Sequence, residues 1–170
     1  MPEPVRDKAV TGADGPPSVW PRPATILRWL LLPSAAGPIL GVAWWLAAPG
    51  GRLYGNGSDY GSWIGRDFAF AGLAALGAVS VVVFMVRAHE RFGFAGRYLG
   101  ALVGSGVGSV LMWLTGTGLG QAFGFLRTDP GLEGSAFGLH ALSALAIWPG
   151  IVAVVSLGLV TVLWSPPHRA

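Results

Sequence analysis

The sequence predicts an all-α polytopic membrane protein in which four transmembrane helices form a bundle around a Gly-rich central third helix. Hydrophobic residues make up 52% of the chain and charged residues only 11%, whereas a soluble domain carries about 25% charged residues. The apolar runs are also long enough for an α-helix to cross a bilayer core, which takes roughly 20 residues. The clearest run has no charged residue between Tyr98 and Leu126.

Composition also limits the chemistry and the partners. The chain has no cysteine, so it offers no disulfide, thiolate metal site or cysteine nucleophile. Ten of the eleven basic residues are arginine, the net charge is +3, and the arginines lie at the ends of the apolar runs. This distribution suits anionic lipid headgroups better than nucleic acid. The expected partners are the lipid bilayer and either the chain itself or another membrane protein, with no nucleic acid.

Polar tails flank the predicted transmembrane domain, which covers residues 25–164. Residues 1–24 are proline-rich and show no helical or strand period, which predicts a disordered cytoplasmic tail. They do not resemble a secretory signal, because the apolar run that follows starts late and is long. Residues 165–170 form a second short cytoplasmic tail.

The first span is predicted at about 27–48. Trp44 and Trp45 lie near its end, where interfacial aromatic residues are expected. Pro33 and Pro38 lie inside it, and each removes one backbone donor. They predict either a kink or a helix that begins only at Pro38.

The second span is predicted at about 67–87, after a Gly- and Tyr-rich connection that favours turns. Asp67 precedes its apolar run and is expected to cap this helix at its own N-terminus. Small residues give the span a face that is a plausible partner for the third helix. These residues are Ala71, Gly72, Ala74, Ala75, Gly77 and Ala78.

The third span, at about 98–124, follows a short link and forms an antiparallel hairpin with the second. Glycines recur in it every four residues, broken only at Met112, and they form what we call the glycine ridge: Gly96, Gly100, Gly104, Gly108, Gly116, Gly120 and Gly124. Small residues at this spacing let helix backbones approach closely in lipid. A step of four exceeds a full turn by about 40°, so the ridge turns by roughly 200° from Gly100 to Gly120. We therefore expect two different helices to pack against its two halves.

The fourth span is predicted at about 139–163, with Pro149 as a kink near its middle. Trp113 and Trp148 lie inside spans, away from the interfaces, and we expect them at the same depth on facing or neighbouring helices. Their expected role, like that of Pro149 and the glycine ridge, is helix packing. A stacking platform for a ligand is the alternative for the two indoles.

The distribution of positive charge predicts the orientation. Eight of the eleven Lys and Arg residues lie at the end of the bundle that holds both termini. The positive-inside rule places that end in the cytoplasm. We therefore expect a plasma-membrane protein with both termini in the cytoplasm.

We expect no catalytic residue, cofactor or metal ion. Every charged residue is predicted in a tail, a loop or the last turn of a helix, which counts against an ion-coupled transporter. Several acids and one histidine gather on the outer side, and a metal site or an acid–base pair is the alternative to capping and solvation for them. Their spacing matches no ligand motif; they are Asp59, Asp67, Asp129, Glu133 and His140.

Several segments carry a resemblance to a known family. The segment from Gly41 to Pro49 closes the first span, and an aspartate precedes Phe68 in the second. The glycine ridge runs past Trp113, and Trp148 and Pro149 follow Ala146-Ile147. Over about 37–163 the chain resembles a family of actinobacterial four-span membrane proteins of unknown function. The resemblance implies an actinobacterial plasma membrane and supplies no activity or catalytic residue.

These observations favour a non-enzymatic structural or accessory membrane protein. The alternative is a subunit of a small transporter or channel, which requires a water-accessible cavity lined by Gln121, Thr115 or the outer acids. A lipid-acting membrane enzyme is the third possibility, and it requires the outer acids and His140 to converge.

Overall fold

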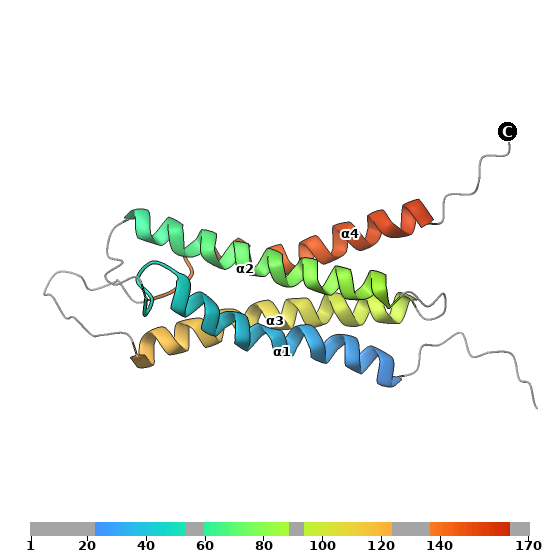
Figure 1. Ribbon diagram of the computed structural model, residues 1–170, viewed down its shortest axis with the longest axis horizontal. Coiled ribbons are helices and arrows are strands. Elements are labelled where there is room, and N and C mark those ends of the chain that lie inside the picture. The colour runs from blue at the N-terminus through green and yellow to red at the C-terminus, as the bar shows by residue number, and fades with distance from the viewer. Residues whose placement is uncertain (1–22, 54–59, 89–93, 124–136, 164–170) are drawn as a thin grey trace, which may run out of the picture.

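Every regular element of the described residues is helical. The computed structural model describes residues 23–53, 60–88, 94–123 and 137–163. Its elements are α1 (Pro23–Ala47), α2 (Tyr60–Arg87), α3 (Phe94–Phe123), the 3₁₀-helix η1 (Leu142–Ala146) and α4 (Ile147–Leu163) (Figure 1). Four segments are long and apolar enough to cross a membrane, which confirms the predicted fold class. Most of both predicted tails, and also Asp59, Gly124, Asp129 and Glu133, lie outside the described residues.

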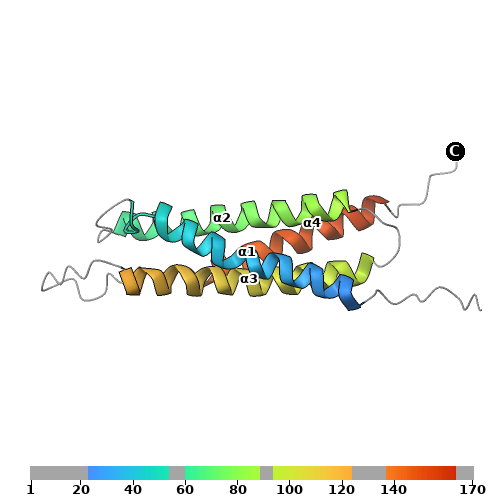
Figure 2. The same cartoon turned by 60° about the horizontal axis from the view of Figure 1, so that its bottom comes forward.

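The helices form a bundle in which α1 packs on α3 and α2, while α4 packs on α2 and α3. Going round the bundle, the order is therefore α1, α2, α4, α3. The ribbons show that α1 and α3 run in one direction and α2 and α4 in the other (Figures 1 and 2). The start of α1 and the end of α4 consequently lie at the same end of the bundle.

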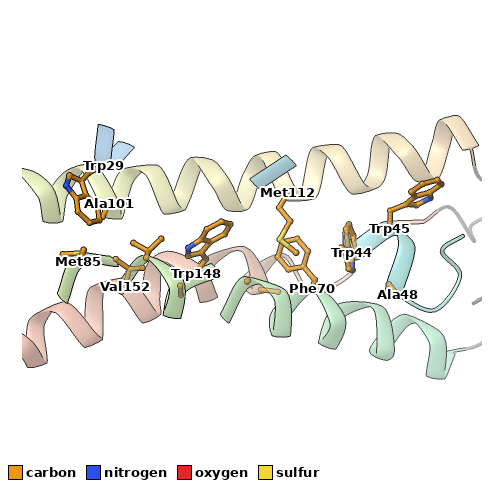
Figure 3. Packing of buried hydrophobic residues seen from close by; sticks show 14 of the residues in the cluster. Trp29, Trp44, Trp45, Ala48, Phe70, Met85, Ala101, Met112, Trp148 and Val152 are labelled. Carbon is orange, nitrogen blue, oxygen red and sulfur yellow. The ribbon is translucent and has the colours of Figure 1, made fainter. Parts of the chain in front are cut away.

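The third helix is the most buried of the four, as predicted. In its most apolar window, 44% of the residues are buried, against 22–28% in the other three spans. Met112 and Ala101 of α3 are fully buried, and so are Ser105 and Ser109. The large residues of the core, including Trp44, Phe70 and Trp148, lie between the helices (Figure 3).

The expectation of two partners on opposite halves of the glycine ridge is wrong for most of its length, because α1 follows it from Gly100 to Gly116. A Cβ added at Gly100 would lie 2.8 Å from the carbonyl oxygen of Ile26, and one at Gly108 would lie 2.5 Å from that of Pro33. A Cβ added at Gly116 would collide with the ring of Trp44. A row of residues spaced by four is inclined to the helix axis. Helix α1 crosses α3 obliquely, so it can track that row (Figures 1 and 2).

The remaining ridge positions have other surroundings. Gly120 is covered by Phe137, which precedes η1, and Gly96 is buried. The small-residue face of α2 does not pack on the ridge, contrary to the prediction. Gly77 of that face lies instead against the Trp148 ring and Leu40.

Proline affects α1 and α4 differently. Helix α1 is continuous through Pro33 and Pro38, so the delayed start at Pro38 is wrong. Pro149 does not kink the middle of a helix, because α4 begins only at Ile147. Pro149 lies in the first turn of α4, where a missing backbone N–H is tolerated. The break before it takes the place of the predicted kink.

Candidate functional site: the junction at the broken fourth span

The fourth span is only partly α-helical. Residues 137–141 form no helix, Leu142–Ala146 form the 3₁₀-helix, and α4 starts at Ile147. Phe137 contacts Gly120, and Leu145 contacts Ser109, so this irregular stretch runs beside α3 between those two levels. Backbone without regular helical bonding at membrane depth must find its hydrogen bonds within the protein. The side chains that supply them, with their neighbours, form a cluster that we call the junction: Trp44, Pro49, Trp63, Arg66, Asp67, Ser109, Phe137 and His140.

Asp67 supplies two of these hydrogen bonds. Its Oδ1 accepts the backbone N–H of His140 at 3.0 Å, and its Oδ2 accepts that of Ala141 at 2.9 Å. The prediction that Asp67 caps the N-terminus of its own helix is therefore wrong. Helix α2 begins at Tyr60, which places Asp67 about two turns inside it. From there Asp67 holds the segment that leads into η1.

Ser109 supplies a third hydrogen bond. Its hydroxyl donates to the carbonyl oxygen of Leu145 at 2.9 Å. In a continuous α-helix that carbonyl would accept the N–H of residue 149, but residue 149 is a proline and has none. The Ser109 hydroxyl thus replaces the donor that Pro149 lacks.

Arg66 ties α2 to the end of α1. It is 1% exposed, and its Nε donates to the carbonyl oxygen of Pro49 at 2.9 Å. Its guanidinium carbon lies 5.1 Å from the centre of the Phe137 ring, within the range of a cation–π contact. Its own carbonyl accepts the indole N–H of Trp44 at 2.9 Å. The prediction that every charged residue lies in a tail, a loop or the last turn of a helix is wrong for Arg66 and Asp67.

Aromatic rings complete the junction. Trp63 stacks on His140, with ring centres 4.8 Å apart and planes inclined by 12°. Trp44 meets Phe70 edge to face at 5.1 Å and lies 4.7 Å from Phe137. Such pairs add to the burial of the rings themselves. Residues from α1, α2 and the stretch before η1 are thereby joined.

The predicted outer acids and histidine are only partly brought together. Asp67 contacts His140 through the backbone N–H of the histidine, not through its ring. In the described parts of the chain, no three His, Cys, Asp or Glu residues are placed to hold a metal ion. Both oxygens of Asp67 accept backbone N–H groups, which gives this carboxylate a structural role.

The two indoles singled out from the sequence occupy different levels. Trp148 is fully buried, with its ring against Gly77 and Gly108. Trp113 is half-buried and packs at the edge of the core. Gly108 and Trp113 are five residues apart on α3, or about 7 Å. The expectation of a shared depth is therefore wrong, although their helices are neighbours.

Sequence reasoning missed Arg66 but not Ser109. The Gly- and Tyr-rich segment before the second span predicts a loop at Arg66, although Trp63 and Ile64 already begin an apolar run. For Ser109, a polar residue of the third span, the sequence predicts a hydrogen bond to another helix, and its bond to Leu145 confirms this prediction. Pro149 was the available signal in the sequence, because a proline leaves the carbonyl four residues earlier without its usual helical donor.

The fold and the junction define an all-α membrane protein with four candidate spans, of which the fourth is broken. A scan against protein-family models finds no match for the chain, and searches of curated proteins and of solved structures find none either.

Proposed function

We propose that the protein is a non-enzymatic structural or accessory component of a cell membrane. The observation that carries this proposal is the use of the polar side chains at the junction. Asp67, Ser109 and Arg66 each bond to backbone groups of other segments. Polar side chains that bond to backbone groups stabilise the fold, which suits a structural or accessory protein.

The interior of the bundle supports the same proposal. Trp44, Trp148, Phe70 and Met112 are fully buried between the helices, and α1 approaches α3 to backbone contact along the glycine ridge. Close packing of this kind favours one rigid arrangement over several. The proposed partners are the bilayer and either a second copy or another membrane protein.

A subunit of a small transporter or channel is the second candidate, and one observation favours it. Irregular backbone within a span is a feature of transporter binding sites, where broken helices meet substrate or ions. The stretch from Phe137 to Ala146 is irregular in this sense. A lipid-acting enzyme, which requires the outer acids and His140 to converge, remains the third proposal, and one of those acids, Asp67, accepts the backbone N–H groups of His140 and Ala141.

We also propose a location and an origin. The arginine distribution supports a plasma membrane with both termini in the cytoplasm. The resemblance of the packing motifs to actinobacterial four-span proteins supports an actinobacterial source. Both proposals rest on the sequence alone.

Purification from native membrane after chemical crosslinking tests the function. We expect a defined partner, or a second copy, to co-elute with the protein. We further expect liposomes that contain the purified protein to show the same ion and solute flux as protein-free liposomes. A protein recovered only as a monomer, together with flux above that control, would overturn the accessory role in favour of the transporter.

A further inference from the structure

The hydroxyl groups of the described helices differ in the hydrogen bonds that they make. Four of them donate to the carbonyl four residues earlier in their own helix, at 2.8–3.1 Å: Ser34, Ser80, Thr117 and Thr161. Ser109 instead reaches across to Leu145. Ser105 and Ser156 are at most 1% exposed, and neither hydroxyl oxygen has a hydrogen-bond partner among the described residues. These two hydroxyls do not make the usual hydrogen bond to their own helices.

Trp148 presents a third buried polar atom of this kind. The residue is fully buried, and its Nε1 has no hydrogen-bond partner within the described ranges. The ring is held on two sides, because a Cβ added at Gly77 or Gly108 would lie 2.9 Å or 3.3 Å from its carbon atoms. In Figure 3 the nitrogen lies on the side of the ring that faces Val152, between α3 and the helices below it. An indole N–H can only donate, so this atom requires an acceptor.

The register of α3 and α4 brings Trp148 and Ser105 to the same level. Ser109 faces Leu145, and the two helices run in opposite directions (Figure 1). Ser105 lies about one turn back along α3 from Ser109, and Trp148 lies about one turn forward along the fourth span from Leu145. Ser105 and Trp148 therefore lie at about the same level of the α3–α4 interface, and the Ser105 hydroxyl and the Trp148 indole form no direct hydrogen bond.

We propose that one buried water molecule bridges Trp148 Nε1 and Ser105 Oγ. The water accepts the indole N–H and donates to the serine hydroxyl, which can act as donor or acceptor. Buried waters take two to four polar partners of this kind and are costly to remove. The bridge links α3 to the first turn of α4, directly after the break in the fourth span.

Nuclear magnetic resonance of the indole groups tests the site in the full chain. The eight tryptophans give separate indole signals, and Trp148→Phe identifies the one that belongs to Trp148. We expect that signal to show a cross-peak to water and slow exchange with solvent. Ser105→Ala should shift it, whereas Ser80→Ala, an exposed hydroxyl bonded to its own helix, should leave it unchanged.

Thermal unfolding in detergent gives a second measurement. If one water joins the two groups, the combined loss of midpoint in Trp148→Phe with Ser105→Ala is smaller than the sum of the single losses. Additive losses, with no water cross-peak at Trp148, would overturn the proposal. A cross-peak to detergent, lipid or an organic solute would overturn it as well. If Trp148→Phe fails to fold, the signal shifted by Ser105→Ala in the otherwise unchanged chain still gives the water readout.

Discussion

Individual glycines of α1 and α3 bring backbone directly onto backbone. A Cβ built on Gly108 would lie 2.5 Å from the carbonyl oxygen of Pro33, and one built on Gly41 would lie 2.5 Å from that of Met112. Each helix thus presents carbonyls to the glycines of the other. Contacts between Cα–H groups and carbonyls recur at such interfaces. In lipid, where apolar side chains gain little from leaving the solvent, this close approach is a main source of stability.

Gly104→Ala should destabilise the bundle, because its Cβ would collide with the backbone of Leu30. Backbone cannot rotate away as a long side chain can, so we expect a loss of about 1–3 kcal/mol. Gly106→Ala is the matched control, since nothing lies within 4 Å of its added Cβ. It should leave the thermal midpoint in detergent unchanged or slightly higher, because alanine favours helix. Equal midpoints for the two variants would contradict the backbone contact.

The sequence predicted one side of this interface better than the other. Glycines spaced by four over a whole helix are visible without a structure. Their counterparts Gly37 and Gly41 lie in a helix with two prolines, where no long repeat draws attention to them. A small-residue pattern indicates that another helix comes close, but every helix is a candidate neighbour. For this reason the sequence favours the small-residue face of α2 as the partner of the ridge, whereas Gly77 of that face contacts Trp148.

Among the elements, the fourth span depends most on its neighbours. Its α-helix is 17 residues long, or about 26 Å, which falls short of a typical hydrocarbon core of about 30 Å. The irregular stretch before it is held by Asp67 of α2 and Ser109 of α3. The existence of the span followed from its apolar composition. The position of the break did not, because it depends on donors and acceptors supplied by other helices.

Asp67→Asn should loosen the start of the fourth span. The asparagine amide would set an N–H group against a backbone N–H, so at least one of the two hydrogen bonds is lost. We expect a loss of about 1 kcal/mol, as for other caps, and faster hydrogen–deuterium exchange in peptides that contain His140 and Ala141. Asp59→Asn removes the same charge from the preceding segment and serves as the control. Exchange at these amides that matches that of the unchanged protein would show that Asp67 does not hold them.

On the scale of the whole molecule, the charge distribution determines the predicted orientation. The chain lacks cysteine, so single cysteines can be introduced without a background signal. Ser18→Cys should react with a membrane-impermeant maleimide only after the cells are permeabilised, because the proposed orientation places the arginine-rich end in the cytoplasm. Ser58→Cys, in the connection between α1 and α2, should react in intact cells. The reverse labelling pattern would overturn the proposed orientation.

The glycine contact between α1 and α3 has a consequence for how the molecule is made. The two helices are parallel, and α2 separates them in the sequence. A ribosome delivers α1 to the bilayer first, and its main docking surface is completed only once α3 has followed. Until then Gly37 and Gly41 lack the α3 backbone that they contact in the folded protein. Assembly of this protein therefore begins with α1 already inserted while its main packing partner, α3, is still absent.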